Sequence, residues 1–339
     1  MMKLLESATI GKMELKNRVI MEPMCMYSAT DHDGIPTHFH RAHYTSRAIG
    51  QVGLIIVEAT GVVPEGRITD DCLGLWNDKQ MTAFKDLVES VHSQGSKIAI
   101  QLNHAGRKCT AVDGVDEIFA PSAIAYNEDY RKPTELSKDQ IKEVVQAFQD
   151  AAKRANEAGF DALEIHAAHG YLLSEFMSPV SNQRTDEYAD ASIIIKEVID
   201  AIRVVWPSEK PILIRVSATD YEDQGLNTDL TIKILEPIKD SVDIINVSTG
   251  GITPTPPHQI FPGYQVEHAL KIKDALQMPV VACGLLGSHD LASYLLESNQ
   301  VDFIGLARPL LKNPHWVVDF AKARRKSEFI PRQYERGFK

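Results

Sequence analysis

The sequence has few cysteines and no region rich in positive charge. Its four cysteines, Cys25, Cys72, Cys109 and Cys283, are widely spaced and form no CxxC pair. This excludes a disulfide framework and favours a reducing, cytoplasmic setting. The formal net charge is -10, and the only short basic run, residues 322–326, is typical of a solvated helix end. We therefore expect no nucleic-acid partner.

Long apolar segments are also missing. No run approaches the roughly 18 apolar residues of a membrane helix, and Glu6 interrupts the N-terminal segment before the apolar stretch of a signal peptide develops. We expect a protein that is neither secreted nor membrane-embedded. No GxGxxG motif follows the first apolar run, so a resident Rossmann dinucleotide site has little support, although a doubly wound sheet stays open.

Eight short apolar runs recur along the chain. They lie near Val19, Ile55, Ala99, Leu163, Ile214, Ile245, Val281 and Ile304. Their hydrophobicity is continuous rather than alternating, which is the pattern of parallel strands buried on both faces. Residues 137–158, which begin like a capping box and stop at Gly159, and residues 288–297 have helical spacing. The alternation predicts a single-domain α/β protein, a (β/α)8 barrel over residues 1–339.

Polar and reactive residues follow these runs directly, where the catalytic rim of such a barrel lies. In chain order they are Pro23, Met24, Cys25 and Tyr27; Ala59; Gln101, His104, Arg107 and Lys108; His166, His169 and Tyr171; residues 248–251; residues 283–287; and Ala307 and Arg308. The Pro-rich residues 248–264 are expected to form a rim loop.

Two of these sites suggest anion or cofactor binding. Gly284, Ala307 and Arg308 suit a phosphate, because small residues after the last strands let backbone N–H groups approach an anion; a turn glycine and a surface arginine are the structural alternative. Arg215 lies inside a buried run and needs a partner. That partner is either a carboxylate such as Glu58 or Glu164, or a phosphorylated aromatic cofactor with a ring carbonyl.

Two histidines and a tyrosine follow the fourth run. His166 and His169 are candidate metal ligands, but no further ligand stands at a typical spacing. As neutral donors they can instead hold a substrate carbonyl oxygen and stabilise charge that develops on it. Tyr171 suits a general acid. Cys25 alone is explained by packing, whereas its place on the rim favours a function.

Together these residues resemble the old yellow enzyme family of flavin-dependent ene reductases, in its bacterial NADPH dehydrogenase branch with an active-site cysteine. The resemblance runs nearly end to end. It rests on LKNRVIMEPMCMYS, AHYTSRAIGQVGLIIVEAT, IQLNHAGRK, APSAIA, EAGFDALEIHAAHGYLLSEFMSPVSNQRTDEY, IRVSATDY, FPGYQV and QYERGF.

The resemblance implies a barrel with tightly, non-covalently bound FMN that NADPH reduces. Its implied FMN contacts are Pro23, Met24 and Cys25 against the isoalloxazine, Ala59 and Gln101 on the pyrimidine edge, Arg215 near N1 and O2, and Gly284, Ala307 and Arg308 on the phosphate. Glu22 would stand close to the flavin, where the family usually has a small residue. Unless it is paired, this carboxylate is expected to lower flavin affinity or potential.

The resemblance further implies hydride transfer to the β-carbon of an α,β-unsaturated carbonyl or nitro compound, with quinones as a third acceptor class. His166, His169 and Tyr27 would bind the substrate oxygen, and Tyr171 would protonate the α-carbon. Cys25 would tune the flavin potential and contact substrate. Arg336 would reach into a neighbouring subunit's site, which implies a homodimer or homotetramer.

The sequence departs from the family pattern at two further places, and two other functions stay open. The loop after Tyr188 is about four residues shorter than in the family, which affects lid geometry. Ala307 replaces a common glycine but keeps a usable N–H. One alternative is a metal-dependent hydrolase or lyase that uses zinc on His104, His166 and His169. The other is a flavin-binding or scaffold protein without turnover.

Overall fold

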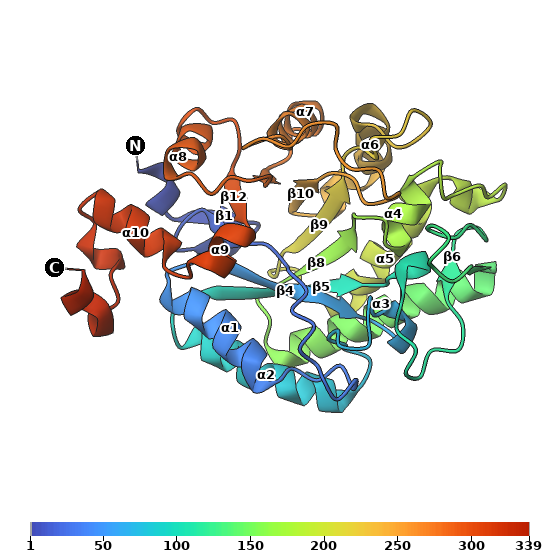
Figure 1. Cartoon of the computed structure of the whole chain (residues 1–339), viewed down its shortest axis with the longest axis horizontal. Helices are drawn as coiled ribbons and strands as arrows, with labels where there is room; N and C mark the ends of the chain where they lie inside the picture. Colours follow the sequence, from blue (N-terminus) through green and yellow to red (C-terminus); the bar gives the residue numbers. More distant parts are fainter. Residues whose placement is uncertain (1, 339) are drawn as a thin grey trace.

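Eight parallel strands close into one barrel in the computed structural model, which describes residues 2–338 (Figure 1). Met1 and Lys339, the ends of the predicted domain, lie outside the described residues. The strands are β3 (Val19–Met21), β4 (Leu54–Gly61), β5 (Lys97–Asn103), β8 (Ala162–Ala167), β9 (Ile212–Ser217), β10 (Ile244–Ser248), β11 (Val280–Ala282) and β12 (Phe303–Leu306). They coincide with the eight predicted runs, so the predicted fold class is confirmed. The doubly wound alternative is wrong, because β12 pairs with β3 and closes the sheet.

The barrel is filled at one end. Every residue of β4 and β8 is buried, as two-sided burial requires. A short hairpin, β1 (Ala8–Ile10) and β2 (Met13–Leu15), packs its apolar side chains against Ile20, Leu54 and Leu213 from the barrel interior. The N-terminal end of the barrel is therefore closed by apolar packing, and the carboxyl ends of the strands carry the polar residues.

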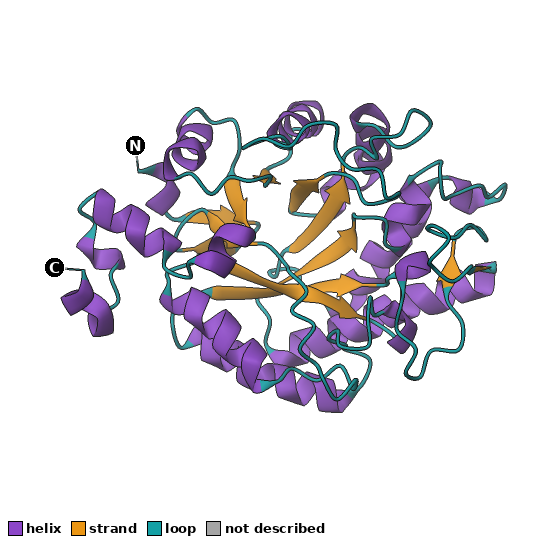
Figure 2. Cartoon of the chain, viewed as in Figure 1, coloured by secondary structure: helices purple, strands orange, loops and turns teal. Residues whose placement is uncertain are grey.

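Helices surround the strands (Figure 2). The longer ones are α1 (His38–Ile49), α2 (Asp78–His92), α3 (Lys138–Ala158), α5 (Ala191–Val205), α6 (Thr228–Leu235), α7 (Val266–Leu276), α8 (His289–Glu297) and α10 (Trp316–Ala323). Both predicted helices are confirmed. The Ser137 side chain accepts from the Gln140 N–H, and Gly159 ends α3 at a φ of 93°. Within residues 2–338, no helix combines the length and apolar character that crossing a membrane requires.

Shorter elements decorate the rim and the chain ends. They are α4 (Leu172–Met177), α9 (Arg308–Lys312), β6 (Phe119–Ala120), β7 (Thr134–Glu135) and the 3-10 helices η1 (Lys3–Leu5), η2 (Pro64–Gly66), η3 (Gly106–Lys108), η4 (Glu187–Ala189), η5 (Glu236–Ser241), η6 (Ser327–Phe329) and η7 (Arg332–Gly337). Residues 249–265 form an irregular segment between β10 and α7, as predicted for a rim loop. The C-terminal segment lies beside α10, outside the helical ring (Figure 1).

Candidate active site

A carboxylate from the second barrel strand holds the loop that follows the first. Glu58 of β4 accepts a hydrogen bond from the Met26 N–H at 2.7 Å and another from the Tyr44 hydroxyl at 3.0 Å. Tyr27, the next residue of this anchored loop, has a φ of 51°, and it is 52% exposed. Pro23, Met24 and Cys25 are half-buried in the same loop. Glu58 thus positions the rim loop and is not the partner that the sequence suggested for Arg215.

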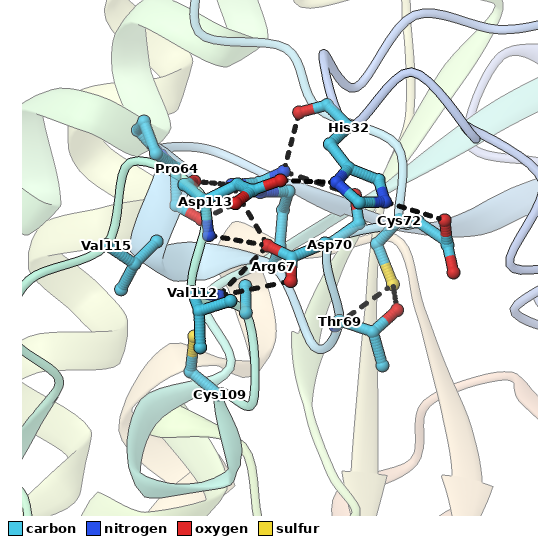
Figure 3. A network of polar contacts seen from close by, with 12 residues as sticks. His32, Pro64, Arg67, Thr69, Asp70, Cys72, Cys109, Val112, Asp113 and Val115 are labelled. Atoms are coloured by element: carbon cyan, nitrogen blue, oxygen red, sulfur yellow. Dashed lines mark hydrogen bonds and ion pairs between the residues drawn. The ribbon is translucent and has the colours of Figure 1, made fainter.

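Cys25 has a second thiol as its neighbour. A hydrogen bond with Cys72, together with burial, raises the pKa of Cys25 well above its ordinary value. Cys72 is buried, and its Sγ lies 3.4 Å from both the backbone N and the Oγ1 of Thr69 (Figure 3). Nothing in the spacing of the cysteines suggested this pair, because the contact depends on how the loops after β3 and β4 fold over each other.

One cavity lies at the carboxyl ends of several barrel strands. It is lined by Glu22 after β3, Arg215 of β9, Gly284 after β11 and Arg308 at the start of α9, and His169 also contributes to its wall. Arg308 is exposed, whereas the Arg215 side chain is buried. The cavity wall therefore carries one exposed and one buried cationic group.

The residues of this cavity fit FMN. The buried Nε of Arg215 has no hydrogen-bond partner among residues 2–338, so it has a donor to offer to a ring carbonyl or nitrogen. Gly284 has a φ of 100°, and a Cβ there would lie 3.1 Å from the Gln265 side chain, so only glycine keeps the backbone open to a phosphate. Ala307 lines the same cavity. Residues 284, 307 and 308 would hold the phosphate, and Arg215 would face the ring.

The direct partner of Arg215 is Glu22. Arg215 Nη2 lies 2.9 Å from Glu22 Oε2, and both side chains are buried. Burial favours loss of the proton from Arg215, but the charge of Glu22 opposes it, and the pKa of Arg215 is raised. The Glu22 carboxylate is therefore paired, so the effect expected of an unpaired carboxylate at this position does not apply. Sequence reasoning missed the pair because Glu22 and Arg215 lie far apart along the chain.

Glu164 belongs to the same buried network, but its hydrogen bonds go to Gln101 and Asn246 and not to the guanidinium of Arg215. Its Oε1 accepts from Gln101 Nε2 at 2.8 Å, and its Oε2 accepts from Asn246 Nδ2 at 2.7 Å. Burial raises the pKa of Glu164 to about 7, and the nearby Glu22 adds to the rise, whereas Arg215 opposes it. The amide nitrogen of Gln101, a predicted flavin contact, is thus bound to Glu164. Ala59, the other predicted contact at that edge, is buried at the end of β4.

The two predicted oxygen-binding histidines lie together with the predicted proton donor. The His166 ring centroid is 5.2 Å from that of His169 and 5.0 Å from that of Tyr171. His169 Nε2 is 2.8 Å from Ser248 Oγ, which holds the ring toward β10. Burial lowers the pKa of both imidazoles well below the usual value, and Arg215 and Lys108 lower it further. Burial also raises the pKa of Tyr171 well above its usual value.

Lys108 completes this group, although the sequence placed it only on the rim. Its ammonium donates to the backbone oxygens of His169 at 2.9 Å and Gly251 at 3.1 Å. It also lies 4.7 Å from the Tyr126 ring centroid and 5.1 Å from that of Tyr171. Burial lowers the pKa of Lys108 to about 8. A lysine in a polar loop carries no sequence signal for such a role.

Two other expectations concern residues that the chain does not bring to this site. Arg336 is exposed on η7, outside the ring of helices, so its predicted contact with a neighbouring subunit is not tested by a single chain. His104 is buried, and its Nδ1 accepts the Gly106 N–H at 3.1 Å. Its ring is therefore already engaged within its own loop.

Among residues 2–338, one group of three side chains lies close enough together to hold a metal ion. It consists of His32, Asp70 and Asp113 (Figure 3). Neither His166 nor His169 belongs to it. Asp70 accepts the backbone N–H groups of Val112 and Asp113, so its carboxylate serves to join two loops. The described residues thus offer no third ligand for the metal-dependent alternative.

Comparisons with known proteins agree with this geometry. Residues 3–327 match the model of the NADH:flavin oxidoreductase / NADH oxidase family. The chain is 47% identical to an NADPH dehydrogenase of Clostridium acetobutylicum over 99% of this chain and all of that one. It is 48% identical to an NADPH dehydrogenase of Bacillus subtilis over 99% of both chains. An old yellow enzyme homologue from Zymomonas mobilis, 27% identical, superposes with a TM-score of 0.81 over 95% of this chain and 93% of that one. The chain therefore belongs to the NADH:flavin oxidoreductase / NADH oxidase family, is of old yellow enzyme type, and is an FMN-dependent oxidoreductase.

Proposed function

We propose that the protein is an NADPH dehydrogenase that reduces α,β-unsaturated carbonyl or nitro compounds. The observation that carries this proposal is that His169 lines the same cavity as Arg215, Gly284 and Arg308. One group suited to a substrate oxygen therefore opens into the same space as the groups suited to FMN. Bound FMN supplies the hydride chemistry, taking a hydride from NADPH and giving it to the acceptor.

The protein's own side chains supply binding and proton transfer. His166 and His169 are held neutral by burial, so each offers an N–H to a carbonyl or nitro oxygen and withdraws charge from the β-carbon. Tyr27 is exposed at the opening and is the third oxygen-binding group. Tyr171 keeps its proton at neutral pH and donates it to the α-carbon. Cys25 contacts substrate and ring from the loop after β3.

The remaining proposed FMN contacts lie on barrel strands or in the loops that follow them. Pro23, Met24 and Cys25 would contact the ring, and Glu22 would act on the ring site through Arg215. Ala59 and Gln101 lie at the pyrimidine edge, where the Gln101 side chain is fixed by Glu164. Because these residues stand on barrel strands or directly after them, the site is rigid.

We also propose a homodimer or homotetramer in the cytoplasm. Arg336 is exposed on η7 beside Tyr334, whose side chain is 41% exposed, so this segment has both charge and apolar area to offer to a second subunit. All four cysteines are free, which agrees with a reducing compartment.

An anaerobic absorption experiment tests the proposal. The purified protein is saturated with FMN, NADPH is added, and cyclohexenone follows once the visible flavin bands have bleached. We expect bleaching with NADPH and recovery with the enone. Bleaching without recovery would leave a flavin protein that lacks enone turnover, and failure to bind FMN would overturn the whole assignment.

A further inference from the structure

Glu22 is a buried carboxylate at the end of the first barrel strand, and its side chain is only 1% exposed. Its Oε2 has two donors, Arg215 Nη2 at 2.9 Å and Asn246 Nδ2 at 3.0 Å. Its Oε1 is buried and has no hydrogen-bond partner. Because Glu22 also lines the cavity, its charge lies next to the proposed ring site rather than deep in the fold.

Gly305 of β12 makes room for this carboxylate. A Cβ at position 305 would lie 1.9 Å from Glu22 Oε1, so the Glu22 carboxylate would have to move. Gly305 is not among the glycines with positive φ, so its backbone conformation does not require glycine. The requirement comes from Glu22, which is therefore held between a strand backbone and a guanidinium.

The Glu22 carboxylate changes the charge that Arg215 presents to the cavity. A buried guanidinium beside a flavin attracts the negative charge that the ring gains on reduction. Glu22 stands 2.9 Å from that guanidinium and offsets its charge. Glu164, the other carboxyl of the network, has its pKa raised to about 7 by burial and holds a proton below that pH. Glu22 is the carboxylate in direct contact with the Arg215 guanidinium, at 2.9 Å.

We propose that Glu22 is a positioning residue that fixes Arg215 in the cavity and, by offsetting its charge, lowers the reduction potential of the bound flavin. This inference rests on the proposed function, because it assumes that FMN occupies the cavity. A lower potential makes the reduced enzyme a stronger hydride donor, which suits acceptors that are only weakly activated.

The first test compares the midpoint potential of bound FMN in Glu164→Gln with that in the double variant Glu22→Gln/Glu164→Gln. The Glu164→Gln background is needed because Glu164 would otherwise ionise and replace the missing charge. We expect the second substitution to strengthen binding of reduced over oxidised FMN about tenfold, a rise of about 30 mV for a two-electron couple. The single variant Glu22→Gln should show a smaller rise. Glu143→Gln, which removes an exposed carboxylate on α3, is the control and should leave the potential unchanged.

An unchanged potential in the double variant, with FMN still bound, would overturn the charge effect. This result differs from failure of the proposed function, which would show as no FMN binding or no enone reduction by the wild type. A potential that falls on removal of Glu22 would also overturn the inference, because the carboxylate would then favour the reduced flavin.

A double-mutant cycle on unfolding tests the positioning role without any redox measurement. Gly305→Ala should lower the folding equilibrium constant at least tenfold in the wild type, because the new Cβ displaces Glu22. In a Glu22→Ser background the same substitution should have little effect, since the shorter side chain leaves room. Equal losses in both backgrounds would show that Gly305 is needed for another reason and would overturn the positioning role.

Discussion

The imidazole of His166 meets that of His169 edge to face, at an interplanar angle of 87°. Within the described part of the chain, neither ring has a carboxylate as a hydrogen-bond partner. His166 Nδ1 accepts the Ala168 N–H at 3.3 Å, and His169 Nε2 faces the Ser248 hydroxyl. Two buried imidazoles this close, near Arg215 and Lys108, do not share the site as cations. The two proposed oxygen-binding imidazoles are therefore neutral.

The first prediction concerns the protonation of these rings. Between pH 5.5 and 8 the ring nitrogens of His166 and His169 should not titrate, because burial lowers the pKa of both well below 6.5. His32, whose pKa is raised by its hydrogen bond to Asp113, should titrate above 6.5 in the same samples. Nitrogen-15 NMR of histidine-labelled protein measures both, with His32→Asn and His169→Asn as assignment variants. A midpoint near 6.5 for His169 would contradict neutral donors.

The second prediction tests the proton donor. Tyr171→Phe should slow reoxidation of the reduced flavin by cyclohexenone by about 100-fold or more, the usual range for loss of a general acid. Reduction of the flavin by NADPH should stay within about twofold, since it needs no proton from Tyr171. Stopped-flow absorbance resolves the two half-reactions, and Tyr294→Phe, at an exposed position on α8, is the control. Equal slowing of both half-reactions would indicate displaced flavin rather than a lost proton.

The third prediction separates phosphate binding from backbone strain. Gly284→Ala should weaken FMN binding about tenfold or more, because the added Cβ meets Gln265 and closes the backbone toward the phosphate. Gly95→Ala is the matched control. The φ of Gly95 is also positive, at 73°, and a Cβ added there would meet no atom of the described residues within 4 Å. Both variants should lose about 1 kcal/mol or more of stability from the left-handed backbone. Fluorescence titration with FMN measures the two affinities. Equal affinity of Gly284→Ala and Gly95→Ala for FMN would contradict the phosphate role of Gly284.

The fourth prediction uses a buried carboxyl below the rim. Glu175 of α4 accepts the Arg107 N–H at 2.9 Å, and burial raises its pKa to about 8. An acid whose folded pKa exceeds its unfolded value binds more protons in the folded state, so folding loses stability as pH rises from about 4.5 to about 8. Glu175→Gln removes this loss. Relative to wild type, the variant should therefore gain stability between pH 5 and pH 8, on the order of a few kcal/mol.

Urea unfolding at the two pH values measures that gain, with Glu143→Gln as a control for removal of an exposed carboxylate. The difference between Glu175→Gln and wild type must change with pH. A difference that is the same at pH 5 and pH 8 would mean that Glu175 is already ionised in the folded protein.

Much of the architecture was predictable because it depends on local patterns. The eight strands were visible as continuous apolar runs, since strands covered on both faces need no polar side. The helix of residues 138–158 was visible through its Ser137 cap and the Gly159 stop, whose chemistry is local. The rule that polar residues gather after the strands of a barrel then placed His166, His169 and Tyr171 on one rim.

The sequence by itself thus determined the barrel and the residue types on its rim, because period, caps and chain order are encoded locally. Only the tertiary structure decided the partners: Arg215 binds Glu22 rather than Glu58 or Glu164, and Cys25 meets Cys72. These contacts join strands and loops that are distant in the chain, so they depend on barrel closure and side-chain direction. Within a closed barrel, a buried charge takes the partner whose atoms reach it, and no spacing in the sequence specifies that distance.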